Sequence, residues 1–194
     1  MRTTCFVAVG LQLREESARP LMQDYPILSH PELPTQAAAL LAHWKQEGVD
    51  LSAVQALTPA TENRLLTVLQ HILTDTGEIN VDHQDVWEVL SDATSLQFGM
   101  ATGEGHSRAE VTGQQLLTSS TMLGDGSLPA HRMLLAIQSG MSAELEMDEL
   151  TQILEYLMDQ TGRQAEVVFG HGLEPTLGEG IRLLLLISRR IILT

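Results

Sequence analysis

Basic residues, cysteine and aromatic residues are all scarce in this chain. Eleven Lys and Arg stand against 25 Asp and Glu in 194 residues, which gives a formal net charge of −14. Because binding to phosphate groups depends on basic side chains, this balance argues against nucleic acid and against anionic membrane surfaces as partners. The single cysteine, Cys5, excludes an internal disulfide, and its apolar neighbours predict a buried thiol.

Long apolar runs are also missing. The N-terminus lacks the apolar run and small-residue cleavage site typical of a signal peptide. The run Ile181–Ile187 is followed by Arg189 and Arg190 and is far shorter than the roughly 20 residues of a membrane span. Apolar residues still make up 43% of the chain and aromatic residues only 4%, so aliphatic side chains should fill a globular core. We expect a cytoplasmic protein.

Periodicity and turn residues predict alternating helices and strands. Helices are predicted over 36–47, 59–76, 107–117 and 144–160 and directly after Asp82; extended segments or strands are predicted over 3–13, 51–57, 94–100, 132–138, 166–170 and 181–188. This order predicts an α/β fold, a two-layer sandwich of helices on a mixed sheet. The last two strands, joined by residues 170–180, are candidates for an antiparallel hairpin.

Residues 77–85 contain the most informative motif. They read Gly-Glu-Ile-Asn-Val-Asp-His-Gln-Asp, which fits the pattern Gly-x-x-Asn-x-Asp-x-x-Asp. Structurally, Asp82 fits the N-cap of the following helix, and Asp85 at its third position favours the positive helix end. Chemically, two carboxylates three residues apart at a helix start can hold a water for attack on a phosphate. The two interpretations are compatible.

The motif resembles the catalytic loop of FtsZ, the bacterial homologue of tubulin. Five further segments resemble FtsZ in the same order: Phe98–Glu104, Arg108–Glu110, Ser119–Leu123, Leu134–Gly140, and Val167–Gly170 with Glu174, Leu177, Ile181 and Arg182. The resemblance implies an FtsZ/tubulin C-terminal-like domain over 80–194. A central connecting helix and the start of the loop would occupy 58–79, and a remnant of the GTPase domain 1–57.

In FtsZ this loop acts on GTP held by the next subunit of a filament. The resemblance implies that Asp82 and Asp85 orient or polarise the attacking water and help to place a cation, while Asn80 positions the loop. An acidic loop repels a triphosphate unless a cation intervenes, so Mg²⁺ in the partner's site is implied. The implied partner is an FtsZ-like subunit or a second copy of this chain.

The resemblance does not extend to the family's glycine-rich phosphate loop. The glycine pairs are isolated: Gly103/Gly105, Gly124/Gly126, Gly170/Gly172 and Gly178/Gly180. They cannot supply the consecutive backbone N–H groups that bind phosphates. We therefore expect no autonomous GTP binding or GTPase activity, with GTP and Mg²⁺ supplied only by a partner subunit. Two alternatives stay open: a non-catalytic module that binds and caps FtsZ filaments, and a truncated or partial FtsZ gene product.

Other candidate sites are weaker. None of the seven histidines has the helical His pairing expected of a metal site, and His83 is interpreted as a surface contact. Arg108 and Glu104 are interpreted as a solvated pair in a turn. The methionines are interpreted as core residues.

Overall fold

The computed structural model describes residues 39, 42, 58–74, 79–91 and 93–190. The strand predicted over 3–13, the helix over 36–47, the extended piece over 51–57 and the buried Cys5 therefore lie outside the described residues, apart from two helical positions at 39 and 42. The proposed GTPase-domain remnant over 1–57 lies there as well. None of the described helices is long and apolar enough to cross a membrane.

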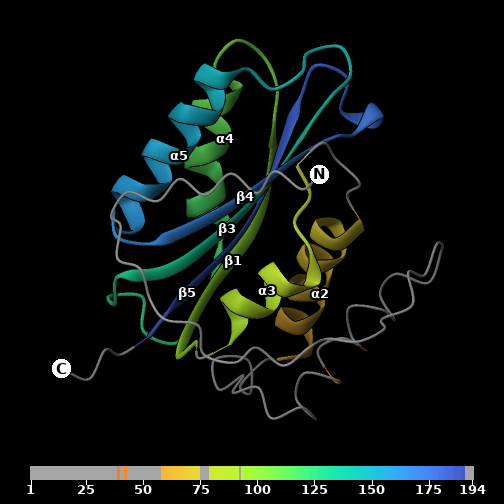
Figure 1. The fold of residues 1–194 in the computed structure, drawn as a ribbon. Helices are drawn as coiled ribbons and strands as arrows, with labels where there is room; N and C mark the ends of the chain where they lie inside the picture. Colours follow the sequence, from red (N-terminus) through yellow and green to blue (C-terminus); the bar gives the residue numbers. More distant parts are fainter. Residues whose placement is uncertain (1–38, 40–41, 43–57, 75–78, 92, 191–194) are drawn as a thin grey trace.

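One mixed sheet of five strands forms the centre of the described structure (Figure 1). Its strands, with the labels of Figure 1, are β1 Ser95–Gly103, β2 Thr121–Leu123, β3 Ala130–Ser139, β4 Glu166–Leu173 and β5 Ile181–Arg189, in the spatial order β2-β1-β5-β3-β4. Only β3 and β4 pair in parallel; the other three pairings are antiparallel. The predicted α/β fold with a mixed sheet is confirmed. Its helices cover both faces of the sheet, which gives three layers where two were expected, and the short strand β2 was not predicted.

The expected hairpin of the last two strands is wrong. β3 lies between β4 and β5, pairing in parallel with the first and antiparallel with the second. The run Leu183–Ile187 is fully buried on both faces of β5, which requires neighbours on both sides and helices above and below. The long segment after β4, which includes the 3₁₀ helix η2 Pro175–Leu177, allows the chain to pass the end of β3.

Helices cover both faces of the sheet (Figure 1). On one face lie α2 Pro59–Thr74 and α3 His83–Leu90, and on the other α4 Arg108–Ser119 and α5 Met147–Thr161. Successive residues of a strand point to opposite faces, so Leu134 and Leu184 pack against the first pair of helices, and Leu135 and Leu185 against the second. The sheet therefore separates two apolar cores.

Both helices of the first pair form where the sequence predicts them. Thr58 Oγ1 accepts a hydrogen bond from Thr61 N at 3.3 Å, as expected of an N-cap before Pro59. The predicted apolar stripe of α2 is buried, including Leu65, Leu69 and Ile72.

Arg108 has a role that the sequence analysis missed. The expected solvated pair with Glu104 is wrong, because Arg108 is 5% exposed and its side chain points inward from the first residue of α4. Its Nε and Nη2 donate to the two carboxylate oxygens of Glu149 in α5, each at 2.7 Å. This bidentate pair lowers the pKa of Glu149, chiefly through the hydrogen bonds from Arg108.

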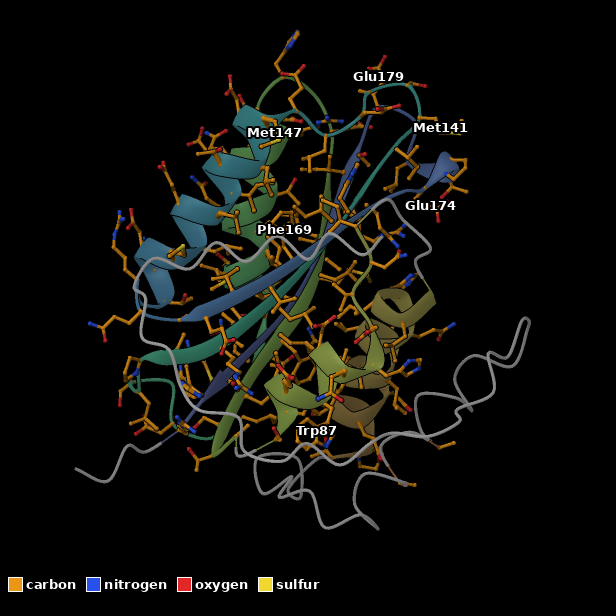
Figure 2. The ribbon with its side chains drawn as sticks, in the orientation of Figure 1. Trp87, Met141, Met147, Phe169, Glu174 and Glu179 are labelled. Carbon is orange, nitrogen blue, oxygen red and sulfur yellow. The ribbon has the colours of Figure 1, made fainter. Side chains whose placement is uncertain are left out.

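The remaining donors of Arg108 bind backbone carbonyls of two loops. Nη1 donates to Ala143 O at 2.8 Å and to Glu179 O at 2.7 Å, and Nη2 donates to Glu144 O at 2.9 Å. Figure 2 shows Glu179 at the end of the sheet at which α5 begins with Met147. One guanidinium thus joins α4, the β3–α5 loop and the β4–β5 loop.

Replacing Arg108 should therefore destabilise the fold strongly. Arg108→Ala leaves the Glu149 carboxylate and three carbonyls without their donor, and we expect a loss of about 3–5 kcal/mol in the free energy of unfolding, measured with urea. Arg163→Ala is the matched control, because exposed Arg163, directly after α5, pairs with exposed Asp159, and its loss should cost less than about 1 kcal/mol. Equal losses for the two variants would contradict this assignment.

Candidate functional site

The loop that leads into α3 is attached to the outer strand β4. Ile79 and His171 form an antiparallel bridge, in which His171 N donates to Ile79 O at 2.9 Å and Ile79 N donates to His171 O at 3.3 Å. Gly170 makes this close approach possible, since a Cβ there would lie 2.7 Å from Ile79 O and 2.8 Å from Val81 Cγ2. The backbone of the loop is thus fixed directly before Asn80.

His171 is itself held by a hydrogen bond across the sheet. Its Nε2 lies 2.7 Å from Ser139 Oγ, which also accepts a hydrogen bond from Leu145 N at 3.2 Å. Which of the two atoms donates in the bond with His171 depends on the tautomer of the imidazole ring. Ser139 and His171 stabilise the strand that carries the loop, and no motif in the sequence identified them.

Asp82 and Asp85 form a reciprocal cap at the start of α3. Asp82 Oδ1 accepts from Gln84 N at 2.9 Å and from Asp85 N at 3.2 Å, while Asp85 Oδ2 accepts from Asp82 N at 2.8 Å. The predicted N-cap and third-position carboxylate are therefore confirmed. Behind them, Val86, Val89 and Leu90 are buried against the sheet, as the periodicity predicts.

The electrostatic environment of the loop is acidic. Burial raises the pKa of Asp85, backbone hydrogen bonding to Asp82 opposes this, and the nearby charges of Asp82 and Glu88 raise it further. A half-buried carboxylate of raised pKa is suited to accepting a proton.

The three predicted site residues differ in exposure. Asn80 and His83 are exposed, and Asp82 and Asp85 are partly buried. The structure brings Asp82 and Asp85 together through the cap, whereas no hydrogen bond among the described residues links the Asn80 side chain to either one. In the described part of the chain, no three His, Cys, Asp or Glu side chains are grouped as a metal site.

Known proteins similar to this chain are FtsZ proteins. Cell division protein FtsZ 1 of Pyrococcus woesei is 30% identical over 158 residues, which cover 81% of this chain and 38% of that protein. Cell division protein FtsZ of Aquifex aeolicus is 30% identical over 104 residues, covering 54% of this chain and 28% of that protein. No family model matches the chain.

The fold is similar to that of solved FtsZ structures. An empty FtsZ dimer from M. jannaschii superposes with a TM-score of 0.53 at 20% identity, over 70% of this chain and 41% of that one. The resemblance to the FtsZ/tubulin family is thereby confirmed in sequence and in fold. This chain spans well under half the length of these relatives, so the activity of a whole FtsZ is not transferred with the similarity.

Adding a methyl group at Gly170 should displace the loop. In Gly170→Ala the new Cβ would press on Ile79 O and Val81 Cγ2, so the bridge to His171 should open. We expect faster hydrogen–deuterium exchange at the amides of Ile79 and His171, measured by NMR. Gly113→Ala is the control, because its Cβ would lie at an ordinary 3.4 Å from Tyr156 and should leave exchange at the loop unchanged. Unchanged exchange in Gly170→Ala would contradict the attachment.

The raised pKa of Asp85 should appear as a pH dependence of stability. The folded state binds this proton more tightly than the unfolded state, so the contribution is fully present below the ordinary pKa of 3.8 and is lost as pH rises through the raised value. Asp85→Asn keeps a side-chain oxygen for Asp82 N but does not titrate. The free energy of unfolding of this variant relative to wild type, measured by urea titration, should therefore increase as pH rises through this range.

Asp125→Asn should show the opposite sign. Hydrogen bonds from the Ser127 side chain and backbone lower the pKa of Asp125, so wild-type stability relative to that variant should decrease as pH falls. The same sign for both variants would contradict the assignment.

Proposed function

We propose that this chain supplies a catalytic loop in trans to GTP bound by a neighbouring FtsZ-like subunit. The observation that carries the proposal is that residues 79–85 of a loop with the FtsZ pattern are hydrogen-bonded at both ends. Its start is attached to β4 by the Ile79–His171 bridge, and its end is fixed to α3 by the Asp82–Asp85 cap. A preorganised loop of this kind can present its side chains to a second molecule without first losing conformational freedom.

The proposed roles follow from the position of each side chain. Asp85, half-buried and with a raised pKa, accepts a proton from the attacking water, and Asp82 orients that water from the helix start. Exposed Asn80 contacts the neighbouring subunit beside its phosphates. The cap of α3 uses Asp82 Oδ1 and Asp85 Oδ2. In the proposed mechanism the attacking water would therefore contact the other carboxylate oxygen of Asp85.

GTP and Mg²⁺ would come from the neighbouring subunit. Carboxylate and amide oxygens are suitable ligands for Mg²⁺, and bound Mg²⁺ would offset the repulsion between the acidic loop and a triphosphate. Two carboxylates are too few to hold the ion alone, so phosphate oxygens and water would complete its coordination. The partner is an FtsZ-like subunit, including a second copy of this chain if that copy holds nucleotide.

A second candidate function is supported by the same cap. Because both aspartates already have a structural role, the loop would keep its shape in a chain that no longer catalyses. Such a chain would bind one end of an FtsZ filament and block further addition. Sedimentation distinguishes the two functions: a chain that blocks filament ends lowers polymer mass at substoichiometric ratios without raising phosphate release.

Phosphate release in a complementation assay tests the first proposal. The chain is mixed with a full-length FtsZ whose own loop aspartates are replaced by alanine, so that only this chain can supply the carboxylates. We expect restored GTP hydrolysis, and a decrease of roughly 100-fold or more when Asp82→Asn or Asp85→Asn is used instead. Asparagine at position 82 caps a helix as well as aspartate does, and at position 85 it keeps a side-chain oxygen for Asp82 N, so both variants remove charge and keep the cap.

Asp125→Asn is the matched control, because Asp125 is an exposed carboxylate in another loop and its replacement should leave activity unchanged. Asparagine variants as active as the wild type would refute the catalytic role. Absence of restored hydrolysis, with lowered polymer mass, would favour the capping module.

A further inference from the structure

His171 lies in a part of β4 that has few side chains to hold it. The strand reads Phe-Gly-His-Gly-Leu over residues 169–173, so a glycine stands on each side of His171. Glycine has no side chain to pack and leaves the backbone more freedom, which weakens a strand at that point. The position of the main chain at residue 171 therefore depends on the contacts that the His171 side chain makes.

β4 is also an outer strand. It pairs with β3 on one side, and its only pairing on the other side within the described residues is the bridge to Ile79 (Figure 1). The bridge consists of two backbone hydrogen bonds, each of modest net strength. A contact of this size follows the strand to which it is attached. The position of Ile79 therefore depends on where the main chain of His171 lies.

Ser139, the last residue of β3, holds His171 from the buried side. In the parallel register Ile137 lies opposite His171 and Ser139 opposite Leu173, so the imidazole ring reaches diagonally to the Ser139 hydroxyl, with Nε2 and Oγ 2.7 Å apart. Ser139 is 0% exposed, and its main-chain oxygen accepts from Glu174 N at 2.9 Å. Ser139 thus holds the end of β4 at two points, through its hydroxyl and through its carbonyl.

The hydroxyl of Ser139 is itself held in place. Oγ accepts from Leu145 N at 3.2 Å, and the carbonyl of the preceding residue, Glu144, is bound by Arg108. A buried hydroxyl with two partners has little rotational freedom, so it restricts the imidazole ring of His171 as well.

We propose that Ser139 and His171 are positioning residues for the candidate catalytic loop. Their hydrogen bond fixes the main chain of His171 between its two glycines, and the bridge passes this position to Ile79 and so to Asn80, the next residue. Neither residue acts on the phosphate itself. The consequence for GTP hydrolysis rests on the proposed function of the loop, whereas the effect on the position of the loop does not.

Hydrogen–deuterium exchange of the chain alone, measured by NMR, tests the positioning directly. The Ile79 amide donates to His171 O, so its exchange rate reports the opening of the bridge. Ser139→Ala and His171→Leu remove the side-chain bond, and we expect exchange at Ile79 to be about fivefold faster or more in both variants. His171→Gln should stay within about twofold of wild type, because its amide offers both a donor and an acceptor to Ser139 Oγ.

Core amides separate this effect from a general loss of stability. A variant that only destabilised the whole fold would speed exchange at buried amides of β5 such as that of Leu185, and would leave the local opening at Ile79 unchanged.

Ser120→Ala is the matched control. The Ser120 hydroxyl also makes a side-chain hydrogen bond of 2.7 Å, to Gln97 Nε2, but it lies beside β1, which β5 and β3 separate from β4. Exchange at Ile79 should therefore stay unchanged in Ser120→Ala.

The complementation assay extends the test to hydrolysis. A displaced loop should lower the maximal rate of phosphate release at saturating chain, by roughly tenfold for Ser139→Ala, without changing the chain concentration that gives half-maximal release. A variant that was only partly unfolded would do the reverse, because its folded fraction would still reach the full rate at saturation. His171→Gln and Ser120→Ala should keep the wild-type maximal rate.

Unchanged exchange at Ile79 in both Ser139→Ala and His171→Leu overturns the proposal, whatever the hydrolysis assay gives. So does an equal effect of Ser120→Ala, or a Ser139→Ala chain that restores hydrolysis at the full maximal rate. If the wild-type chain restores no hydrolysis while Ile79 exchanges faster in Ser139→Ala, the proposed function fails and the positioning of the loop by Ser139 and His171 stands.

Discussion

The position of β5 determines the rest of the structure. Its apolar run Leu183–Ile187 is buried on both faces, so the strand must lie inside the sheet with helices above and below it. β3 takes one side of β5 and β1 the other, and this places β4 and β2 at the two margins. The candidate loop then attaches to β4, so its position follows from the place of β5 in the sheet.

The structural role of the loop and its proposed catalytic role involve the same side chains. α3 has only eight residues, too few for a stable isolated helix, so it depends on its cap and on burial of Val86, Val89 and Leu90. The reciprocal bonds of Asp82 and Asp85 supply that cap and also fix the two carboxylates relative to each other. The helix cap of α3 is therefore compatible with the proposed catalytic role of its two aspartates. The cap would provide the rigidity that catalysis by positioning requires.

Local features of this protein could be predicted from the sequence, and long-range ones could not. The Thr58 and Asp82 caps depend on residues within one turn, and the apolar stripe of α2 depends on helical spacing, so both were visible in the sequence. The order of the strands depends on pairings between distant segments, and the hairpin prediction failed for that reason. Arg108 is buried because carbonyls from two loops converge on it, and only the fold brings these together. The Ser139–His171 bond is likewise a product of the β3–β4 pairing.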